Sequence, residues 1–313
     1  MLQEVEIWDA TKLSSYTCEM RGHYAMERHL QPKEPSEALA FGIAFHKAVE
    51  VWTQALATIP EANDSDRAAA VVAGKQAFVE AWERELPQEV RDNLELLGDR
   101  RSVANGFRLF EAFTRKFPIE MYDKVVATET PFTLYLGKTP SGREISWSGI
   151  LDRAVVWQGG LYYVDIKTSS YSLDDRFFSQ FRLSGQMTGY AWAGQELGMG
   201  NFDGVMIQAV EVKAPAKTAR GRTVEELIGV DIIPILQEHI EEWKQDTLRK
   251  IDLIHEARER QHWVRNRGEI CNSFTGCSFK RVCTAHPDLR EQIIAENYRE
   301  RKWNPLARDE VKE

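Results

Sequence analysis

Two acidic residues and a lysine stand close together in the segment SGILDRAVVWQGGLYYVDIKTS, residues 148–169. Two strand-like runs flank Gly159-Gly160, a pair suited to a two-residue hairpin turn because both positions tolerate positive φ. With this turn, Asp152 is predicted to face Lys167 across the hairpin. Since residues two apart on a strand share a face, Asp165 joins them. The sequence therefore predicts two carboxylates and an amine on one side of a sheet.

This set of side chains has a natural use with a hard divalent cation such as Mg²⁺, which binds carboxylate oxygens, water and phosphate oxygens. Such a cation lowers the pKa of water, and a lysine offsets developing negative charge. The alternative is a surface hairpin in which Asp165 and Lys167 are solvated and Asp152 pairs with Arg153. Asp165 and Lys167 interrupt an otherwise apolar strand, where buried charges are costly unless paired or metal-bound.

The four cysteines form a second candidate site. Cys18 stands alone near the start, whereas Cys271, Cys277 and Cys283 are separated by two gaps of five residues. Four thiolates can hold a [4Fe–4S] cluster or a zinc ion. Buried free thiols and disulfides are the competing interpretations, and a reducing cytoplasm disfavours disulfides.

The elements that position these residues are predicted from periodicity and β-propensity. Helical patterns cover about 36–57, 66–86 and 99–117, and strands are expected at 124–136, 144–157, 161–168 and 204–212. Further helices are expected at 174–197, 231–262 and 288–302. Strands in the middle with helices before, between and after them predict an α/β core sheet covered by helices.

Composition excludes several classes of protein. The 313 residues carry a net charge of −8, which argues against nonspecific coating of nucleic acid by a basic surface. The 32 aromatic residues (14 Phe, 9 Tyr, 9 Trp) exclude a mainly disordered chain. No apolar run approaches the roughly 18 residues of a membrane span, and the N-terminus lacks a secretion-signal pattern. We therefore expect a cytoplasmic protein without membrane association.

Four motifs together resemble those of RecB-like nucleases in the PD-(D/E)XK superfamily, and they occur in the family order. They are Gly42-x-x-x-His46-x-x-x-Glu50, Gly149-x-x-Asp152-Arg153, Asp165-Ile166-Lys167 and Gln186-x-x-x-Tyr190. The third motif has Asp where many members have Glu, a substitution that the superfamily allows.

The resemblance implies a role for each matching position. His46, Asp152, Asp165 and the Ile166 carbonyl would be ligands of Mg²⁺ or Mn²⁺, and Lys167 would position the attacking water. Gln186 and Tyr190, one helical turn apart, would contact DNA near the scissile phosphate. Taken alone, His46 would be interpreted as a hydrogen-bonded core residue, and Glu129 is a weaker candidate better explained as a solvated glutamate.

One branch of these nucleases has one cysteine before the first motif and three after the last, binding an iron–sulfur cluster. It includes the nuclease domain of AddB and the CRISPR-adaptation exonucleases. By resemblance, Cys18, Cys271, Cys277 and Cys283 would bind a structural [4Fe–4S] cluster. The family commonly has C-x2-C-x5-C at the end, so the first gap here departs from the pattern.

The resemblance implies one nuclease domain over residues 1–313, with a restriction-endonuclease-like core at about 36–262. The cysteine-bearing ends, 1–35 and 263–303, would be helical segments joined by the cluster, and 304–313 a polar tail. The implied activity is exonucleolytic hydrolysis of DNA, chiefly at single-stranded ends, within recombination or repair and with a possible helicase or recombination partner. The alternatives are a noncatalytic DNA-end-binding or scaffold subunit and a zinc-bearing binding protein.

Basic residues occur in two separate places that could lie near a DNA path. Arg100, Arg101 and Arg108 lie on or before a predicted helix, and a loop after the fourth predicted strand carries Lys213, Lys217, Arg220 and Arg222. A solvated loop is the ordinary interpretation, whereas in a nuclease such residues could bind phosphates.

Overall fold

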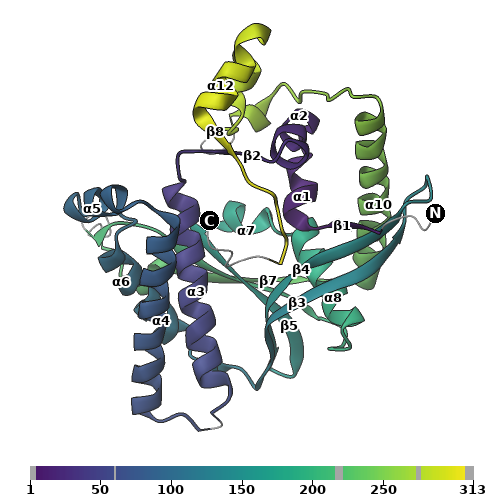
Figure 1. Cartoon of the computed structure of the whole chain (residues 1–313). Coiled ribbons are helices and arrows are strands. Elements are labelled where there is room, and N and C mark those ends of the chain that lie inside the picture. The colour runs from purple at the N-terminus through teal and green to yellow at the C-terminus, as the bar shows by residue number, and fades with distance from the viewer. Residues whose placement is uncertain (1–4, 60, 216–220, 273–275, 307–313) are drawn as a thin grey trace. The chain divides into compact units, whose positions relative to one another are not determined.

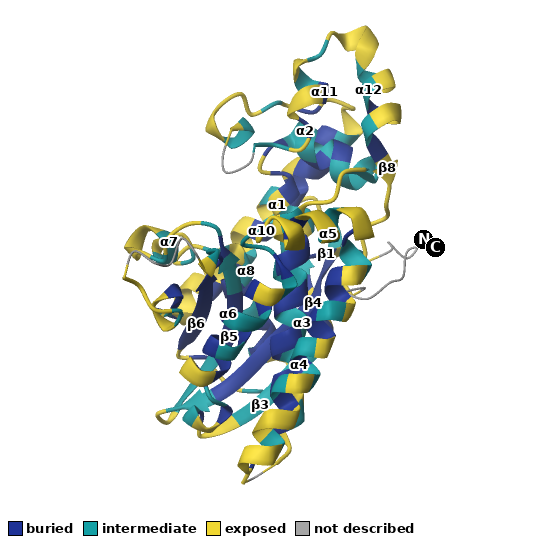
Figure 2. Cartoon of the chain, turned by 90° about the vertical axis from the view of Figure 1, so that its left-hand side faces the viewer, coloured by how far each residue is buried: buried dark blue, intermediate teal, exposed yellow. Residues whose placement is uncertain are grey.

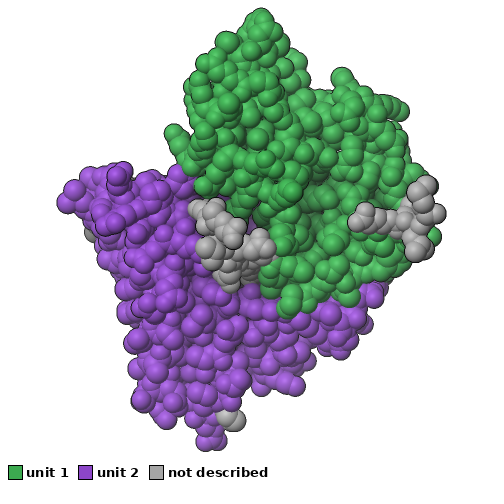
Figure 3. Space-filling view, viewed as in Figure 1, with its two compact units in different colours: residues 1–34, 131–150, 238–313 green, residues 35–130, 151–237 purple. Residues whose placement is uncertain are grey.

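The computed structural model describes residues 5–59, 61–215, 221–272 and 276–306. Its chain divides into two compact units (Figure 3). One unit, here called unit 2, comprises Pro35–Thr130 and Leu151–Gln237. The other, unit 1, comprises Met1–Glu34, Pro131–Ile150 and Glu238–Glu313. The division falls within two long strands, β3 (Lys124–Lys138) and β4 (Glu144–Trp157).

Unit 2 contains the central strands of a mixed sheet. The second half of β4 pairs antiparallel with β5 (Gly160–Ser169), β5 pairs parallel with β6 (Gly204–Glu211), and β6 pairs antiparallel with β7 (Ile228–Pro234). Every residue of β6 is buried, as expected for a strand covered on both faces.

Helices α3 (Glu37–Ala57), α4 (Asp64–Glu85) and α6 (Val103–Lys116) cover one face of these strands. Their phenylalanines and tryptophans pack with Val164 and Ile166 of β5 in one core. In Figure 1, α3 and α4 lie side by side, and Figure 2 shows the exposed outer side of α4. Ser36 caps α3 by accepting a hydrogen bond from the Leu39 N–H, which is the preferred chemistry at a helix start.

The other elements of unit 2 are short. They are α5 (Gln88–Leu96), η2 (Ile119–Met121), α7 (Asp175–Ser179), α8 (Gly185–Glu196) and η3 (Glu225–Leu227).

Unit 1 combines the beginning and end of the described chain. Strand β1 (Glu6–Trp8) pairs parallel with the first part of β4, and β2 (Leu30–Pro32) pairs antiparallel with β8 (Tyr298–Glu300). The long helix α10 (Gln237–Glu259) belongs almost entirely to this unit. Its shorter elements are α1 (Ala10–Ser15), α2 (Glu19–Gly22), η1 (His23–Glu27), η4 (Glu269–Cys271), α11 (Lys280–Thr284), η5 (Pro287–Leu289) and α12 (Arg290–Asn297).

The predicted mixed α/β fold with a sheet flanked by helices is confirmed, but several predicted elements were wrong in extent. The helix expected at 231–262 begins as strand β7, because Pro234 cannot continue a helix and β-branched residues precede it. The helix expected at 174–197 is divided into α7 and α8, and the one expected at 288–302 ends at Asn297, before β8. No helix of the described chain is long and apolar enough to cross a membrane.

Candidate active site

Strand β5 carries a buried carboxylate and an amine that pair with each other. Asp165 is 1% exposed, and Lys167 Nζ donates to its Oδ1 at 3.1 Å. The same Nζ is 2.9 Å from Oδ2, but Oδ2 has no hydrogen bond of acceptable geometry. The two groups therefore form a close ion pair in which the hydrogen-bonding capacity of Oδ2 is not fully used. Such an atom is rare in a protein interior and marks a place where a further ligand would be accommodated.

The hairpin turn lies one residue earlier than the sequence suggested. Gln158 and Gly159 both have positive φ, 51° and 78°, and Trp157 pairs with Gly160. The predicted pairing of Asp152 with Lys167 is therefore wrong by two residues. A two-residue turn of this type requires positive φ at both central positions. Gln158 occupies the first of these positions, where we had predicted a glycine.

The corrected register keeps the acidic residues on one face. The pairing runs to Arg153 opposite Val164, so Asp152 directly precedes the last paired residue of β4 and Asp165 directly follows the last paired residue of β5. Because a shift of two residues preserves the face of every side chain, Asp152 remains on the side of Asp165 and Lys167. Asp152 is also buried, with 8% of its surface exposed.

Helix α3 brings His46 to the two strands. Its Nε2 lies 2.6 Å from the Ile166 carbonyl oxygen, and its Nδ1 lies 3.8 Å from Asp152 Oδ2. Since a carbonyl can only accept, Nε2 carries the proton in this hydrogen bond. The structure thus joins the histidine of the first motif to residues of the second and third motifs.

The electrostatics of Asp165 reflect this crowding. Burial raises the pKa of Asp165 above its ordinary value, the Lys167 ammonium acts in the opposite direction, and the Asp152 carboxylate adds to the rise. His46 also favours the ionised form. A second positive charge near both carboxylates would relieve their repulsion and the cost of burying them.

Helix α8 contributes the fourth motif. Lys167 Nζ is 3.5 Å from Gln186 Oε1, so Gln186 lies beside the ion pair. Tyr190 instead packs on Tyr163, with ring centroids 5.1 Å apart, and the Tyr163 hydroxyl donates to Asp165 Oδ1 at 3.3 Å. We did not predict Tyr163, although its place two residues before Asp165 puts it on the same face.

A small cavity of about 10 Å³, about the size of one water molecule, adjoins His46 and Asp152. Glu50, Glu129 and the buried Arg153 also line it. Glu129 has a φ of 42°, and such strained backbone clusters at functional sites. The weaker candidate of the sequence analysis thus lies beside the motif residues.

No group of three or more His, Cys, Asp or Glu side chains is arranged to hold a metal ion within residues 5–59, 61–215, 221–272 and 276–306. In this arrangement the Ile166 carbonyl accepts from His46 and Asp165 pairs with Lys167. The donor set nevertheless fits a hard cation chemically, because it offers two carboxylates, a carbonyl and an imidazole.

The cysteines form a separate group in unit 1, and all four are free thiols. Asn266 joins two of them, since its N–H donates to Cys18 Sγ at 3.4 Å and its carbonyl accepts from Cys271 Sγ at 3.4 Å. Burial raises the pKa of Cys283, Arg265 opposes the rise, and Cys277 and Cys18 add to it. The pattern of contacts brings residues some 250 positions apart in the sequence into one neighbourhood.

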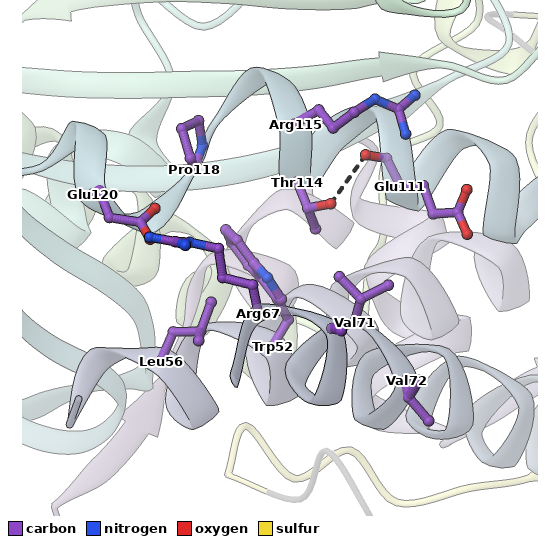
Figure 4. A pocket seen from close by; sticks show the side chains of 11 residues that line it. Trp52, Leu56, Arg67, Val71, Val72, Glu111, Thr114, Arg115, Pro118 and Glu120 are labelled. Carbon is purple, nitrogen blue, oxygen red and sulfur yellow. Dashed lines mark hydrogen bonds and ion pairs between the residues drawn. The ribbon is translucent and has the colours of Figure 1, made fainter. Parts of the chain in front are cut away.

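A larger and mainly apolar pocket of about 530 Å³ lies between α3, α4 and α6 (Figure 4). Trp52, Leu56 and Val71 line it, and the ion pair between Arg67 and Glu120, 2.7 Å apart, lies at its edge. None of the four motif segments contributes a lining residue, so this pocket is distinct from the candidate active site.

Of the comparisons with known proteins, the family comparison agrees with the motifs. The family model described as the PD-(D/E)XK nuclease superfamily matches residues 10–284. The crystal structure of a "putative exonuclease" from Eubacterium rectale is similar with 12% identity and a TM-score of 0.46, over 85% of this chain and 86% of that one. The crystal structure of SSO0001 is similar with 13% identity and a TM-score of 0.31, over 88% and 92%.

No curated protein matches the sequence. Because the TM-scores are low, the assignment to a family rests on the family match. This match covers residues from both compact units and every position of the four motifs. The chain belongs to the PD-(D/E)XK nuclease superfamily.

Proposed function

We propose that this protein is a metal-dependent deoxyribonuclease that hydrolyses phosphodiester bonds with Asp152, Asp165 and Lys167. The observation that carries the proposal is the buried Asp165 carboxylate, which pairs with Lys167 and interacts electrostatically with Asp152 and His46. Two buried carboxylates with one lysine are a costly arrangement for stability alone. A divalent cation would make the arrangement favourable.

The residues have distinct roles in this proposal. His46, Asp152, Asp165 and the Ile166 carbonyl would hold Mg²⁺ or Mn²⁺, the ions that nucleases of this superfamily typically use. The bound ion would supply a lowered water pKa and charge neutralisation at the phosphate. Lys167 Nζ orients the attacking water and stabilises negative charge in the transition state.

Gln186 and Tyr190 lie on the same side of α8, one helical turn apart. Gln186 is within 3.5 Å of Lys167, so its amide can bind a phosphate oxygen next to the reacting one. Tyr190 supports Tyr163 through its ring and thereby holds the hydroxyl that donates to Asp165.

The motif resemblance to RecB-like nucleases supports a proposal for the type of DNA that is cut and for the cellular process in which it is cut. We propose exonucleolytic cleavage of single-stranded DNA ends, in recombination or repair, by residues 1–313 acting as one nuclease domain. The family match from 10 to 284 supports this extent because it includes segments of both units.

We also propose that Cys18, Cys271, Cys277 and Cys283 hold a [4Fe–4S] cluster. The shared contacts to Asn266 and the mutual influence of Cys18, Cys277 and Cys283 support a common site. Thiolates are the usual ligands of such clusters. The cluster would fix the two ends of a loop of more than 200 residues, which is costly in entropy to close otherwise.

The activity is tested with the purified full chain on DNA labelled at the 5′ or the 3′ end, as single and double strands. We expect loss of the label from single strands with Mg²⁺ or Mn²⁺ and none with EDTA. The label that disappears first gives the polarity. If no substrate is cut with either ion and the cofactor is intact, the proposed activity is wrong.

The cluster is tested by the visible absorption spectrum and by iron and sulfide analysis of protein purified without oxygen. We expect a brown preparation with about four iron atoms per chain. A Cys283→Ser variant should lose the colour. A colourless wild-type preparation containing zinc would overturn this part of the proposal.

A further inference from the structure

A further buried carboxylate, that of Glu211, lies at the end of β6 and belongs to none of the four motifs. Glu211 is fully buried, and its two oxygens lie 3.3 Å from Lys213 Nζ and 2.9 Å from Arg222 Nη2. The Ser172 hydroxyl is 3.5 Å from the same carboxylate. Lys213 and Arg222 keep 33% and 42% of their side chains exposed. One buried anion therefore holds two cations at the surface.

The basic residues before and on α6 meet this loop. Arg108 Nη2 and Asn105 Nδ2 both donate to the Lys213 carbonyl, at 2.9 Å and 3.0 Å. Arg101 donates to the Ser170 hydroxyl at 2.9 Å. Arg101 and Arg108 of one basic group thus meet Lys213 and Arg222 of the other at the ends of β5 and β6. Lys217 and Arg220, which the sequence also offered, lie outside the described residues.

The location relates this cluster to Asp165 and Lys167. In the parallel pairing of β5 and β6, Lys167 lies opposite Ala209 and Ser169 opposite Glu211. Residues paired in this way share a face, as do residues two apart on one strand. Glu211 therefore lies on the face of Lys167, two residues further along, or about 7 Å at the usual rise per residue.

Cations outnumber carboxylates in this cluster. Among the described residues, Arg101, Arg108, Lys213 and Arg222 have only two carboxylates within 4.0 Å, those of Glu211 and Glu37. In a chain with a net charge of −8, such an excess needs a reason. Burying Glu211 has a large desolvation cost, which is expected where cations must be held in place for a ligand.

We propose that Lys213 and Arg222, positioned by Glu211, bind backbone phosphates of the DNA strand that enters the candidate active site. The inference rests on the proposed nuclease function and adds a substrate-binding surface to it. Arg101 and Arg108 extend the positive potential along the same strand ends. Phosphate contacts of this kind are independent of sequence and weaken with salt.

The test measures binding apart from cleavage. A labelled oligothymidylate is titrated, at several sodium chloride concentrations, with full-length protein carrying Lys167→Ala. Adding Lys213→Gln and Arg222→Gln should weaken binding on the order of tenfold. The slope of the logarithm of the binding constant against the logarithm of the salt concentration should become shallower by about 1.4, which is about 0.7 for each lost phosphate contact. An unchanged affinity and slope would overturn the inference.

Two further variants keep the result interpretable. Removal of both cations leaves the Glu211 carboxylate buried without a cation to pair with. A variant that also carries Glu211→Gln avoids that destabilisation, and it should show the same loss of affinity. The matched control replaces Arg67 and Lys75 of α4, an arginine and a lysine that pair with Glu120 and Glu111. This control should bind DNA as the parent does.

The outcomes also separate the inference from the proposed function. If wild-type protein cuts no DNA but binding depends on Lys213 and Arg222, the nuclease proposal fails and the binding surface stands. If wild-type protein cuts DNA and binding ignores these two residues, the nuclease proposal stands and the binding surface is wrong.

Discussion

At the scale of single residues, the proposed chemistry depends on one carboxylate whose burial lowers the stability of the fold. Asp165 is almost completely buried, and burial raises its pKa. A folded-state pKa above the unfolded value means that the ionised form is disfavoured by folding, so this group lowers stability at neutral pH. Such a cost is typical of functional sites, where activity and stability compete.

Replacing Asp165 with asparagine should therefore separate the two properties. We expect Asp165→Asn to abolish DNA cleavage and to raise the free energy of unfolding of metal-free protein by about 1 kcal/mol, because the amide removes the buried charge while Lys167, whose side chain is 26% exposed, keeps access to water. Urea unfolding in EDTA at neutral pH measures this change. A marked loss of stability would mean that the Asp165–Lys167 pair is structural.

Alternation along two strands predicted that Asp152, Asp165 and Lys167 share a face, whereas the other candidate residues came from the motif resemblance. It did not predict the contact between His46 and the Ile166 carbonyl, which depends on how α3 packs on β5. Glu211 gave no signal either, because its two cations lie on a loop and its burial comes from tertiary packing.

At the scale of elements, the hairpin between β4 and β5 sets the positions of the second and third motifs. The predicted faces were correct although the register was wrong, because an error of two residues preserves the face. Strand β7 was missed inside a predicted helix, yet its β-branched residues and Pro234 were a usable signal. Long periodic elements such as α3 were predicted closely, since one helical pattern spans them.

A substitution in the turn distinguishes the two registers. In the structure Gln158 has positive φ, where asparagine is favoured and Asn-Gly is the preferred pair. We expect Gln158→Asn to raise the free energy of unfolding by about 0.5 kcal/mol. With the turn at Gly159-Gly160, position 158 would be in a strand and asparagine would destabilise it, so a lower unfolding free energy would contradict the structure.

At the scale of the whole chain, ion pairs of unit 1 join distant parts of the sequence. Glu6 Oε2 lies 2.6 Å from His255 Nε2 of α10, and Glu6 Oε1 lies 3.1 Å from Lys12 Nζ and 3.5 Å from Arg258 Nη1. Burial alone would raise the pKa of Glu6, but the His255 hydrogen bond and the cations lower it to about 2.

This lowered pKa predicts how stability depends on pH. A depressed carboxyl pKa contributes stability above the unfolded value of 4.5 and loses it as pH falls towards 2. Glu6→Gln should lower the unfolding free energy by on the order of 2 kcal/mol at neutral pH, after allowance for partial exposure. The difference from wild type should shrink below pH 4.5, and a difference that grows on acidification would refute this explanation.

The central claim is tested most directly by the rate of metal-dependent cleavage of end-labelled single-stranded DNA by Lys167→Ala. We expect the rate to fall about 100-fold or more relative to wild type, as when a group stabilising the transition state is removed. Lys75→Ala, which removes a lysine from another ion pair, should cleave at the wild-type rate. Cleavage by Lys167→Ala at the wild-type rate would contradict the proposed mechanism.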